Sequence, residues 1–208
     1  LATGTLNSNN LINDNWRLFF MTAYAPIALF VYNRPEHTRQ TLDALKRAKG
    51  ASKSTLYVFS DGPKPGHEEK VEEVRTLLKG LSGFKKVIVK KSSSNKGLAS
   101  SIIAGVTDVV KRHRRVIVLE DDLITSPYFL QYMNDGLDYY EDEPRVASIH
   151  AYVPPVKEPL PETFFLRGTD CWGWATWGDR WEQFEVDGKK LYRKLKRRNL
   201  TYAFNRDN

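Results

Sequence analysis

The sequence predicts an α/β fold in which a mostly parallel sheet is covered by helices. The first observation is that short apolar runs alternate with longer amphipathic stretches between residues 27 and 149. The second is that helix start and stop signals separate the two, such as Pro127 after Ser126 and the glycine at 83. The third is that polar residues follow each of the first four apolar runs. This alternation is typical of strand-helix-strand crossover units, which build parallel sheets.

The individual elements follow from the spacing of apolar residues. Five strands are expected from short apolar runs, at 27–32, 55–60, 86–90, 115–119 and 145–149. Four helices are expected between them, at 36–48, 68–81, 98–112 and 127–140. The chain therefore predicts a doubly wound arrangement with one strand after each helix.

The two ends of the chain differ from this central part. Residues 1–20 lack apolar periodicity and are expected to be a leader, a tag or a loose arm, without the pattern of a secretory signal. Residues 21–150 hold the alternating elements. Residues 151–208 begin with prolines, which favour loop or edge structure, and hold four of the five tryptophans, between 172 and 181. A basic amphipathic helix is expected at 189–198.

Composition excludes several classes of protein. The length of 208 residues suits one domain, and no apolar run is long enough to span a bilayer. The single cysteine, Cys171, cannot form an internal disulfide, which favours a cytoplasmic protein. The formal net charge is +7, but segment 189–198 alone carries seven basic residues and no acidic one. Nucleic-acid binding is therefore not expected. That helix either contacts the inner face of a membrane or is a solvated surface.

The strand ends are where a ligand is expected, because ligands of open parallel sheets bind at the carboxyl edge. The strongest signal is the triplet Glu120, Asp121 and Asp122 after the fourth strand. Three adjacent carboxylates repel one another unless a cation lies among them. Oxygen ligands suit Mg²⁺ or Mn²⁺, which also bind substrate phosphates. The alternative is a solvated acidic turn.

The other strand ends give weaker signals. Ser92–Ser94, Asn95, Lys96 and Gly97 precede a helix whose free N–H groups suit an anion, although serine and asparagine also cap ordinary helices. Asn33 and Arg34 before Pro35 form either a ligand contact or a simple strand-to-helix turn. Asp61 before Gly62 is as typical of a turn as of a ligand site. A cation and a helix amino end would bracket a diphosphate.

The tryptophan block also has two interpretations. Its tryptophans include helical spacings, which are typical of core residues. The glycines among them, Gly173 included, would also let a flat substrate such as a sugar ring approach the backbone. The motifs GxGxxG after the first strand, GxxxxGK[ST] and GxSxG do not occur. Nicotinamide enzymes and P-loop NTPases are therefore not favoured.

Several stretches together resemble the GT-A glycosyltransferases, which bind nucleotide-diphospho-sugars on a Rossmann-like sheet. The stretches are PIALFVYNRPEHTRQTLDAL, LYVFSDGPK, SNKGLASSIIAGV, VIVLEDDLITSPYFLQYMNDGLDYYEDEPRVASI and CWGWATWGDRWEQF. They are most similar to bacterial relatives of the N-acetylglucosaminyltransferase I branch. The resemblance implies a nucleotide-sugar donor, very often UDP-linked, a Mn²⁺ ion, a glycan or other hydroxyl acceptor, and inversion at the anomeric carbon.

The resemblance also implies roles for single residues. Asp122 would be the metal ligand, and Asp121 and Glu120 would lie against the ribose and the donor sugar. On the donor side, it further implies Asn33, Arg34 and Asp61 at the nucleoside and Asn95, Lys96 and Gly97 at the diphosphate. On the acceptor side, the block from Gly173 and Trp174 to Trp177 would help to form the pocket. Residues 21–150 would then bind the donor, and residues 151–208 would face the acceptor.

The catalytic base is the open point of the resemblance. Relatives continue into a further segment that supplies an acidic base, which implies a base beyond Asn208 and a C-terminal part that is truncated here. Asp170 and Asp179 are the acids nearest the expected pocket. Two rival functions stay open: a metal-dependent nucleotidyltransferase, and a non-catalytic module that binds carbohydrate or a membrane surface.

Overall fold

The structure is a computed structural model that describes residues 23–205. Its centre is a six-stranded sheet in the order β3-β2-β1-β4-β6-β5. The strands are β1 (Ile27–Val31), β2 (Thr55–Ser60), β3 (Lys86–Lys91), β4 (Arg115–Glu120), β5 (Ile149–His150) and β6 (Trp174–Trp177). The four strands from β3 to β4 are parallel, and β6 runs antiparallel to both β4 and β5. The α/β class and the mostly parallel sheet expected from the sequence are confirmed.

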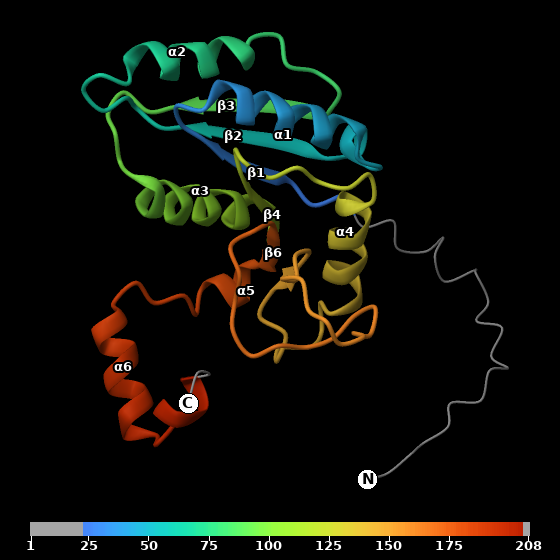
Figure 1. Ribbon diagram of the computed structural model, residues 1–208, viewed down its shortest axis with the longest axis vertical. Coiled ribbons are helices and arrows are strands. Elements are labelled where there is room, and N and C mark those ends of the chain that lie inside the picture. The colour runs from blue at the N-terminus through green and yellow to red at the C-terminus, as the bar shows by residue number, and fades with distance from the viewer. Residues whose placement is uncertain (1–22, 206–208) are drawn as a thin grey trace, which may run out of the picture.

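Helices cover both faces of the sheet (Figure 1). They are α1 (Pro35–Arg47), α2 (Glu68–Leu77), α3 (Leu98–His113), α4 (Phe129–Tyr139), α5 (Gly178–Trp181), α6 (Gly188–Arg197) and α7 (Thr201–Phe204), with a short 3-10 helix η2 (Ala51–Lys53). Side chains of α1, α2 and α4 form one apolar core with Ile27, Leu29 and Val31 of β1. The alternate residues of β1, Ala28 and Phe30, join α3 in a second core on the other face. This alternation is what the period of two in a strand requires.

Sequence order produces a switch point next to β1. From β1 the chain winds outward through α1 to β2 and through α2 to β3, and α3 then returns it to β4 on the other side of β1. The loops after β1 and β4 therefore lie side by side at the carboxyl edge of the sheet, where the direction of winding reverses. A crevice for ligands is typical of this position.

The prediction of a strand at 145–149 is wrong. Only Ile149–His150 form a strand there, and it pairs antiparallel with β6 instead of extending the parallel sheet. Val146 and Ile149 are still buried, at 8% and 7% exposure, because they pack into the core from a turn and from β5. The strand that lies beside β4 is the unexpected WATW segment, β6.

Helix bounds differ from expectation by a few residues. The stretch 68–81 is helical only to Leu77, because the chain turns at Gly80, whose φ is +69°. The stretch 127–140 is helical from Phe129, after a turn in which the Ser126 hydroxyl accepts a hydrogen bond from the Tyr128 N–H at 3.3 Å. The expectation for residues 1–20 lies outside the described residues.

The helices α6 and α7 lie away from the sheet (Figure 1). No residue of either helix is buried, and Asp187 caps α6 by accepting a hydrogen bond from the Lys190 N–H. The basic helix expected at 189–198 is therefore present, with bounds one residue earlier. Within residues 23–205, no helix combines the length and the apolar character that a membrane crossing requires.

Candidate functional site at the carboxyl edge of the sheet

The acidic triplet ends β4 at the switch point. The last strand residue is Glu120, and the Asp121 side chain after it is only 3% exposed, whereas that of Asp122 is 39% exposed. The backbone N–H of Tyr32 donates to Oδ2 of Asp121 at 3.1 Å, and the Thr41 hydroxyl donates to the Asp121 carbonyl at 3.0 Å. Asp121 therefore holds the loop after β1 and helix α1 against the end of β4.

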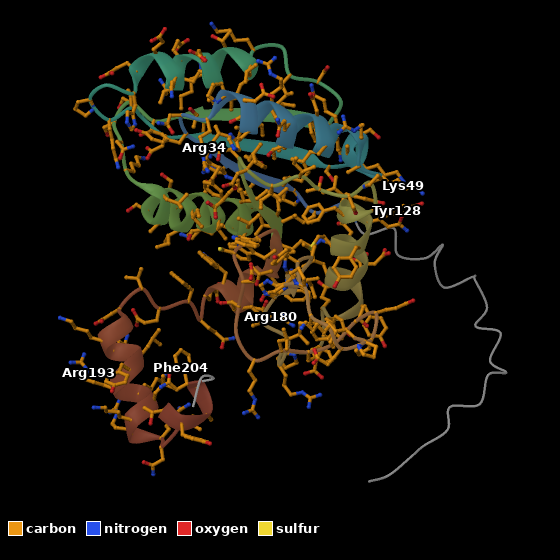
Figure 2. The ribbon with its side chains drawn as sticks, viewed as in Figure 1. Arg34, Lys49, Tyr128, Arg180, Arg193 and Phe204 are labelled. Atoms are coloured by element: carbon orange, nitrogen blue, oxygen red, sulfur yellow. The ribbon has the colours of Figure 1, made fainter. Side chains whose placement is uncertain are left out.

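Arg34 is the cation that faces this triplet. One guanidinium nitrogen lies 2.9 Å from Oδ1 of Asp121, and the other terminal nitrogen lies 2.8 Å from Oδ2 of Asp122. The sequence left Arg34 as a ligand contact or a turn residue, and the structure brings it onto two of the three carboxylates. Figure 2 labels Arg34 at the edge of the sheet, between the two helix layers.

The electrostatics of the triplet follow from crowding and burial. Burial raises the pKa of Glu120, the charges of Asp122 and Asp121 raise it further, and Arg34 opposes them. Burial also raises the pKa of Asp121, against the Tyr32 N–H and Arg34, which stabilise its carboxylate. An additional cation at this edge would therefore be attracted by charge that Arg34 alone does not balance.

Asp61 joins the loops after β2 and β3. Its carboxylate is 9% exposed and accepts hydrogen bonds from the backbone N–H groups of Gly62, Lys96 and Gly97, at 2.8 to 3.0 Å, and from the Asn95 amide at 3.2 Å. A turn residue and a ligand contact were equally compatible with the sequence around Asp61, and in the structure this carboxylate joins two loops. The N–H groups of Lys96 and Gly97, just before α3, bind Asp61 and are therefore not available to an anion.

Glycine is required at two positions of this junction. Gly97 precedes α3 with φ of +79°, a left-handed conformation that side chains disfavour. A Cβ on Gly62 would lie 2.3 Å from the backbone carbon of Ser94. Arg75 of α2 reinforces the junction by donating to the carbonyls of Asp61 and Ser92, at 3.2 and 2.7 Å. The loops after β2 and β3 are therefore held together as one unit.

His67 connects Asn33 to the loop after β2. Its Nδ1 lies 3.1 Å from the Asn33 amide nitrogen and 2.9 Å from the Tyr32 hydroxyl. The amide nitrogen of Asn33 is thus engaged within the protein. Sequence reasoning missed His67, Thr41 and Arg75, because their partners lie on other loops and no spacing along the chain reports such contacts.

The tryptophans occupy three different environments. Trp177 is 3% exposed and packs on the α4 face, where its indole N–H donates to the Leu137 carbonyl. Trp174 is half-buried on the α3 face and stacks with Trp181 at 5.8 Å between ring centroids. Trp172 is 51% exposed at the carboxyl edge and lies 4.6 Å from the Tyr152 ring. The core interpretation thus applies to Trp177, and contact of the exposed tryptophan with a sugar ring stays a prediction.

The two acids expected near the pocket are separated. Asp170 is exposed and accepts a hydrogen bond from the Trp172 N–H at 2.7 Å. Burial is the main cause that raises the pKa of the Cys171 thiol, and the charges of Glu120 and Asp170 raise it further. The segment that holds Asp170 and Cys171 therefore lies beside the triplet. Asp179 lies two residues after Trp177, and Trp177 pairs with Arg115 at the amino end of β4. The triplet begins at Glu120, at the other end of β4. At 3.3 Å per strand residue, Asp179 therefore lies roughly 16 Å from the triplet.

Asp179 is also engaged with another group. Its carboxylate lies 2.6 Å from the Arg180 guanidinium, which lowers the pKa of Asp179. Arg180 in turn donates to the Glu141 carbonyl and covers the Trp177 ring, and Figure 2 labels it well apart from Arg34. The position of Asp179 thus does not support the prediction that this acid lies near the acceptor pocket.

Gly173, the remaining expected residue, lies near the edge, and His150 of β5 was not among the expected site residues. Gly173 has φ of +78°, and a Cβ there would lie 3.3 Å from the Phe129 ring, so glycine brings the segment close to α4. His150 of β5 is half-buried, and its Nε2 lies 2.6 Å from the Ser148 hydroxyl. Within residues 23–205, no group of three or more histidine, cysteine, aspartate or glutamate side chains is arranged to hold a metal ion.

A family model matches most of the chain. The model of Glycosyl transferase family 2 matches residues 27–199, a range that contains all of the edge loops described above. No curated protein matches the chain.

Solved structures show distant similarity. The mannosyltransferase PcManGT from Pyrobaculum calidifontis, in complex with GDP-Man and Mn²⁺, is 14% identical over 55% of this chain and 33% of its own, with a TM-score of 0.41. TarS 1–349 from S. aureus, in complex with UDP, is 13% identical over 66% and 38%, with a TM-score of 0.44. A 4-diphosphocytidyl-2C-methyl-D-erythritol synthase is 11% identical over 83% and 85%, with a TM-score of 0.42. The chain thus spans less than two fifths of the length of the first two.

Proposed function

This chain belongs to Glycosyl transferase family 2, and from that premise we propose that it transfers a sugar from a nucleoside-diphosphate-sugar to a hydroxyl acceptor. The observation that carries the proposal is the cluster at the switch point, where Asp121 and Asp122 meet Arg34. Crevices at switch points bind nucleotides in many open sheets. The donor is proposed to be UDP-linked, as the resemblance to the N-acetylglucosaminyltransferase I branch implies, and we propose that branch for this chain.

A divalent cation, Mn²⁺ or Mg²⁺, is proposed at Asp122. The fit is favourable because this carboxylate is 39% exposed and stands at the end of a buried strand, beside two further acids. One carboxylate together with substrate phosphates is a common way of holding Mg²⁺. When bound, the cation would stabilise negative charge on the departing diphosphate.

The other edge residues are proposed to shape the donor site. Asp61 fixes the loop that carries Asn95, Lys96 and Gly97, so that the Lys96 ammonium stays available for the diphosphate side. Asn33, fixed by His67, would border the nucleoside. Glu120 and Asp121 would lie against the donor sugar and the ribose.

The acceptor side is proposed to be the segment with Asp170, Gly173 and Trp174. Asp170 is the acid of this segment that lies beside the triplet, and we assign it the role of local base candidate. A base removes the proton of the acceptor hydroxyl as that oxygen attacks the anomeric carbon from the side opposite the diphosphate, which gives inversion. Residues 21–150 would thus form the donor part, and residues 151–208 the acceptor part.

Calorimetry with UDP tests this function. UDP should bind in the presence of Mn²⁺ and lose at least about tenfold in affinity with a chelator, because the acids otherwise repel the diphosphate. The Asp122→Asn variant should behave like the chelated protein. Asp43→Asn, which removes an exposed carboxylate on α1, is the matched control and should bind as the unaltered chain does.

Two results would redirect the proposal. Equal binding of UDP with and without the cation would remove the metal from the site. Binding of a glycan with no response to UDP would favour a carbohydrate-binding module.

Incubation with a nucleoside triphosphate and a sugar phosphate tests the nucleotidyltransferase alternative, which predicts release of pyrophosphate.

We also propose that α6 contacts an anionic membrane surface, on the cytoplasmic side. Exposed Leu191 and Tyr192 lie among the basic residues of this helix, and Arg193, Lys196 and Arg197 line a hollow of about 380 Å³. Basic residues near a negative leaflet contribute about 1 kcal/mol each. Flotation with vesicles that contain phosphatidylserine should recover the protein, and recovery that does not depend on this lipid would contradict the proposal.

A further inference from the structure

Arg34 binds two neighbouring carboxylates with different nitrogens. One nitrogen lies 2.9 Å from Asp121, and the other lies 2.8 Å from Asp122. The two halves of this contact differ in their surroundings. The Asp121 side chain is 3% exposed and also accepts the Tyr32 N–H. The Asp122 side chain is 39% exposed, and that of Arg34 is 45% exposed.

Burial decides which half is stronger. A buried carboxylate that loses its cation is left uncompensated in a medium of low dielectric constant, so Asp121 should keep Arg34. An exposed pair is screened by water and is worth little, so Asp122 can exchange its partner at small cost. The guanidinium is therefore fixed at Asp121, whereas its contact with Asp122 can be replaced.

Charge at the edge favours such an exchange. Glu120, Asp121 and Asp122 carry three negative charges when ionised, and Arg34 balances one of them. The charge of two that is left equals that of one divalent cation. The cation would approach Asp122 from solvent, because that carboxylate is the exposed member of the two that Arg34 binds.

We propose that Arg34 is the resident counter-ion of Asp122, which a divalent cation replaces, and that the guanidinium nitrogen so released binds the diphosphate of the donor. The inference rests on the proposed function, because it presupposes a cation and a diphosphate at this edge. A guanidinium held at Asp121 is well suited to the second role, since its planar donors match phosphate oxygens. The same side chain thus opposes the cation when the donor is absent and supports the donor when the cation is present.

This exchange couples the two ligands. A group that competes with the first ligand and binds the second makes the affinity for each depend on the other, and the coupling is reciprocal. Arg34→Gln should therefore shift the two affinities in opposite directions. Simple damage to the site would weaken both.

The experiment measures Mn²⁺ by electron paramagnetic resonance, with and without UDP, and measures UDP by calorimetry at saturating Mn²⁺. Arg34→Gln should bind Mn²⁺ alone about two- to fivefold more tightly, the range for loss of an exposed ion pair. It should bind UDP at saturating Mn²⁺ about tenfold or more weakly, because a charge-assisted contact is lost. Arg34→Lys keeps the charge beside buried Asp121 but has one ammonium in place of two terminal nitrogens. It should therefore also bind Mn²⁺ alone more tightly, and it should recover part of the UDP affinity.

Arg39→Gln is the matched control. Arg39 lies on α1 and pairs with Glu36 at the exposed surface, so its removal changes net charge equally without touching the triplet. Mn²⁺ and UDP should bind this variant as they bind the unaltered chain. Equal tightening of Mn²⁺ in Arg39→Gln and Arg34→Gln would show an effect of net charge alone and would overturn the exchange.

Two further results separate the inference from the proposed function. If Arg34→Gln and Arg34→Lys bind Mn²⁺ alone no more tightly than the unaltered chain, while that chain binds Mn²⁺ and UDP together, the counter-ion exchange is wrong and the proposed function stands. If the unaltered chain binds neither ligand, the proposed function fails and the inference fails with it. Circular dichroism of each variant identifies any that does not fold, and the lysine variant then decides.

Discussion

Replacing Asp61 with asparagine should loosen the junction between the loops after β2 and β3. The side chain is 9% exposed, and its two oxygens accept bonds from three backbone N–H groups and one amide. Asparagine keeps the shape but has one acceptor oxygen. Whichever oxygen becomes an amine, at least one backbone N–H, that of Gly62 or that of Gly97, then faces a donor.

The magnitude follows from this count. Hydrogen bonds to a charged group contribute about 1.5–3 kcal/mol each, and the bonds that survive lose their charge assistance. A loss of one to two such bonds predicts a decrease of about 2–4 kcal/mol in the free energy of unfolding. The N–H groups of Lys96 and Gly97 would then lose hydrogen bonds to residue 61, so the loop that carries Lys96 should also become more mobile.

Urea unfolding followed by tryptophan fluorescence measures this loss, with hydrogen exchange at the amides of Lys96 and Gly97 as a local probe. Asp43→Asn is the control, because that exposed carboxylate lies 3.9 Å from its partner Lys46 and should contribute little. A stability change within about 0.5 kcal/mol for Asp61→Asn, the size of an ordinary surface substitution, would refute the structural role of this carboxylate.

Three further predictions concern stability. Gly62→Ala should destabilise the protein by about 1–3 kcal/mol in urea, because its Cβ would lie 2.5 Å from the Ser94 carbonyl oxygen and the backbone must shift. Trp181→Phe should cost about 1 kcal/mol or more, because the indole N–H donates to the Thr107 hydroxyl at 2.9 Å. Burial lowers the pKa of His113 from its ordinary value of 6.5, so the folded chain binds fewer protons than the unfolded chain below that pH. Stability should therefore fall as the pH decreases through this window, and His113→Gln should reduce the fall in melting temperature between pH 7 and pH 5.

Each of these has a control in the same chain. Gly188→Ala meets no atom within 4 Å and should not destabilise, in contrast to the glycine at 62. Trp172→Phe changes a ring that is 51% exposed and should leave the urea midpoint within error. Gln40→Ala, which changes an exposed uncharged residue of α1, should keep the full pH dependence. Identical behaviour of any variant and its control would contradict the corresponding prediction.

The parallel part of the sheet could be predicted because its signals are local. Strands such as Ile27–Val31 and Arg115–Glu120 are short apolar runs between helices with clear ends. The antiparallel part could not be predicted in the same way. Apolar residues near 146–149 are buried mainly by packing from a turn, whereas Trp174–Trp177 has spacings that suit a helix, a strand or a binding surface.

The candidate site divides along the same line. The acidic triplet is visible in the sequence because its members are adjacent and follow a strand. The pairing of the triplet with Arg34 is not visible in the sequence, because Arg34 and Asp122 are 88 positions apart and only the fold brings them together. Asp179 shows the converse error, since it is close to Gly173 in sequence but β6 carries it to the other end of the sheet.

The position of β3 has a consequence for how copies of this protein meet. In the described part of the chain β3 pairs with β2 alone, so it leaves one row of backbone N–H and C=O groups at the edge of the sheet. An open edge invites strand pairing between molecules, which leads to aggregation. Lys86 and Lys91 are the exposed residues of this strand, and two such edges would bring their like charges together, whereas Lys90 is paired with Asp108. The lysines thus protect the protein from edge-to-edge association at high concentration, and this protection should weaken as salt screens the charges.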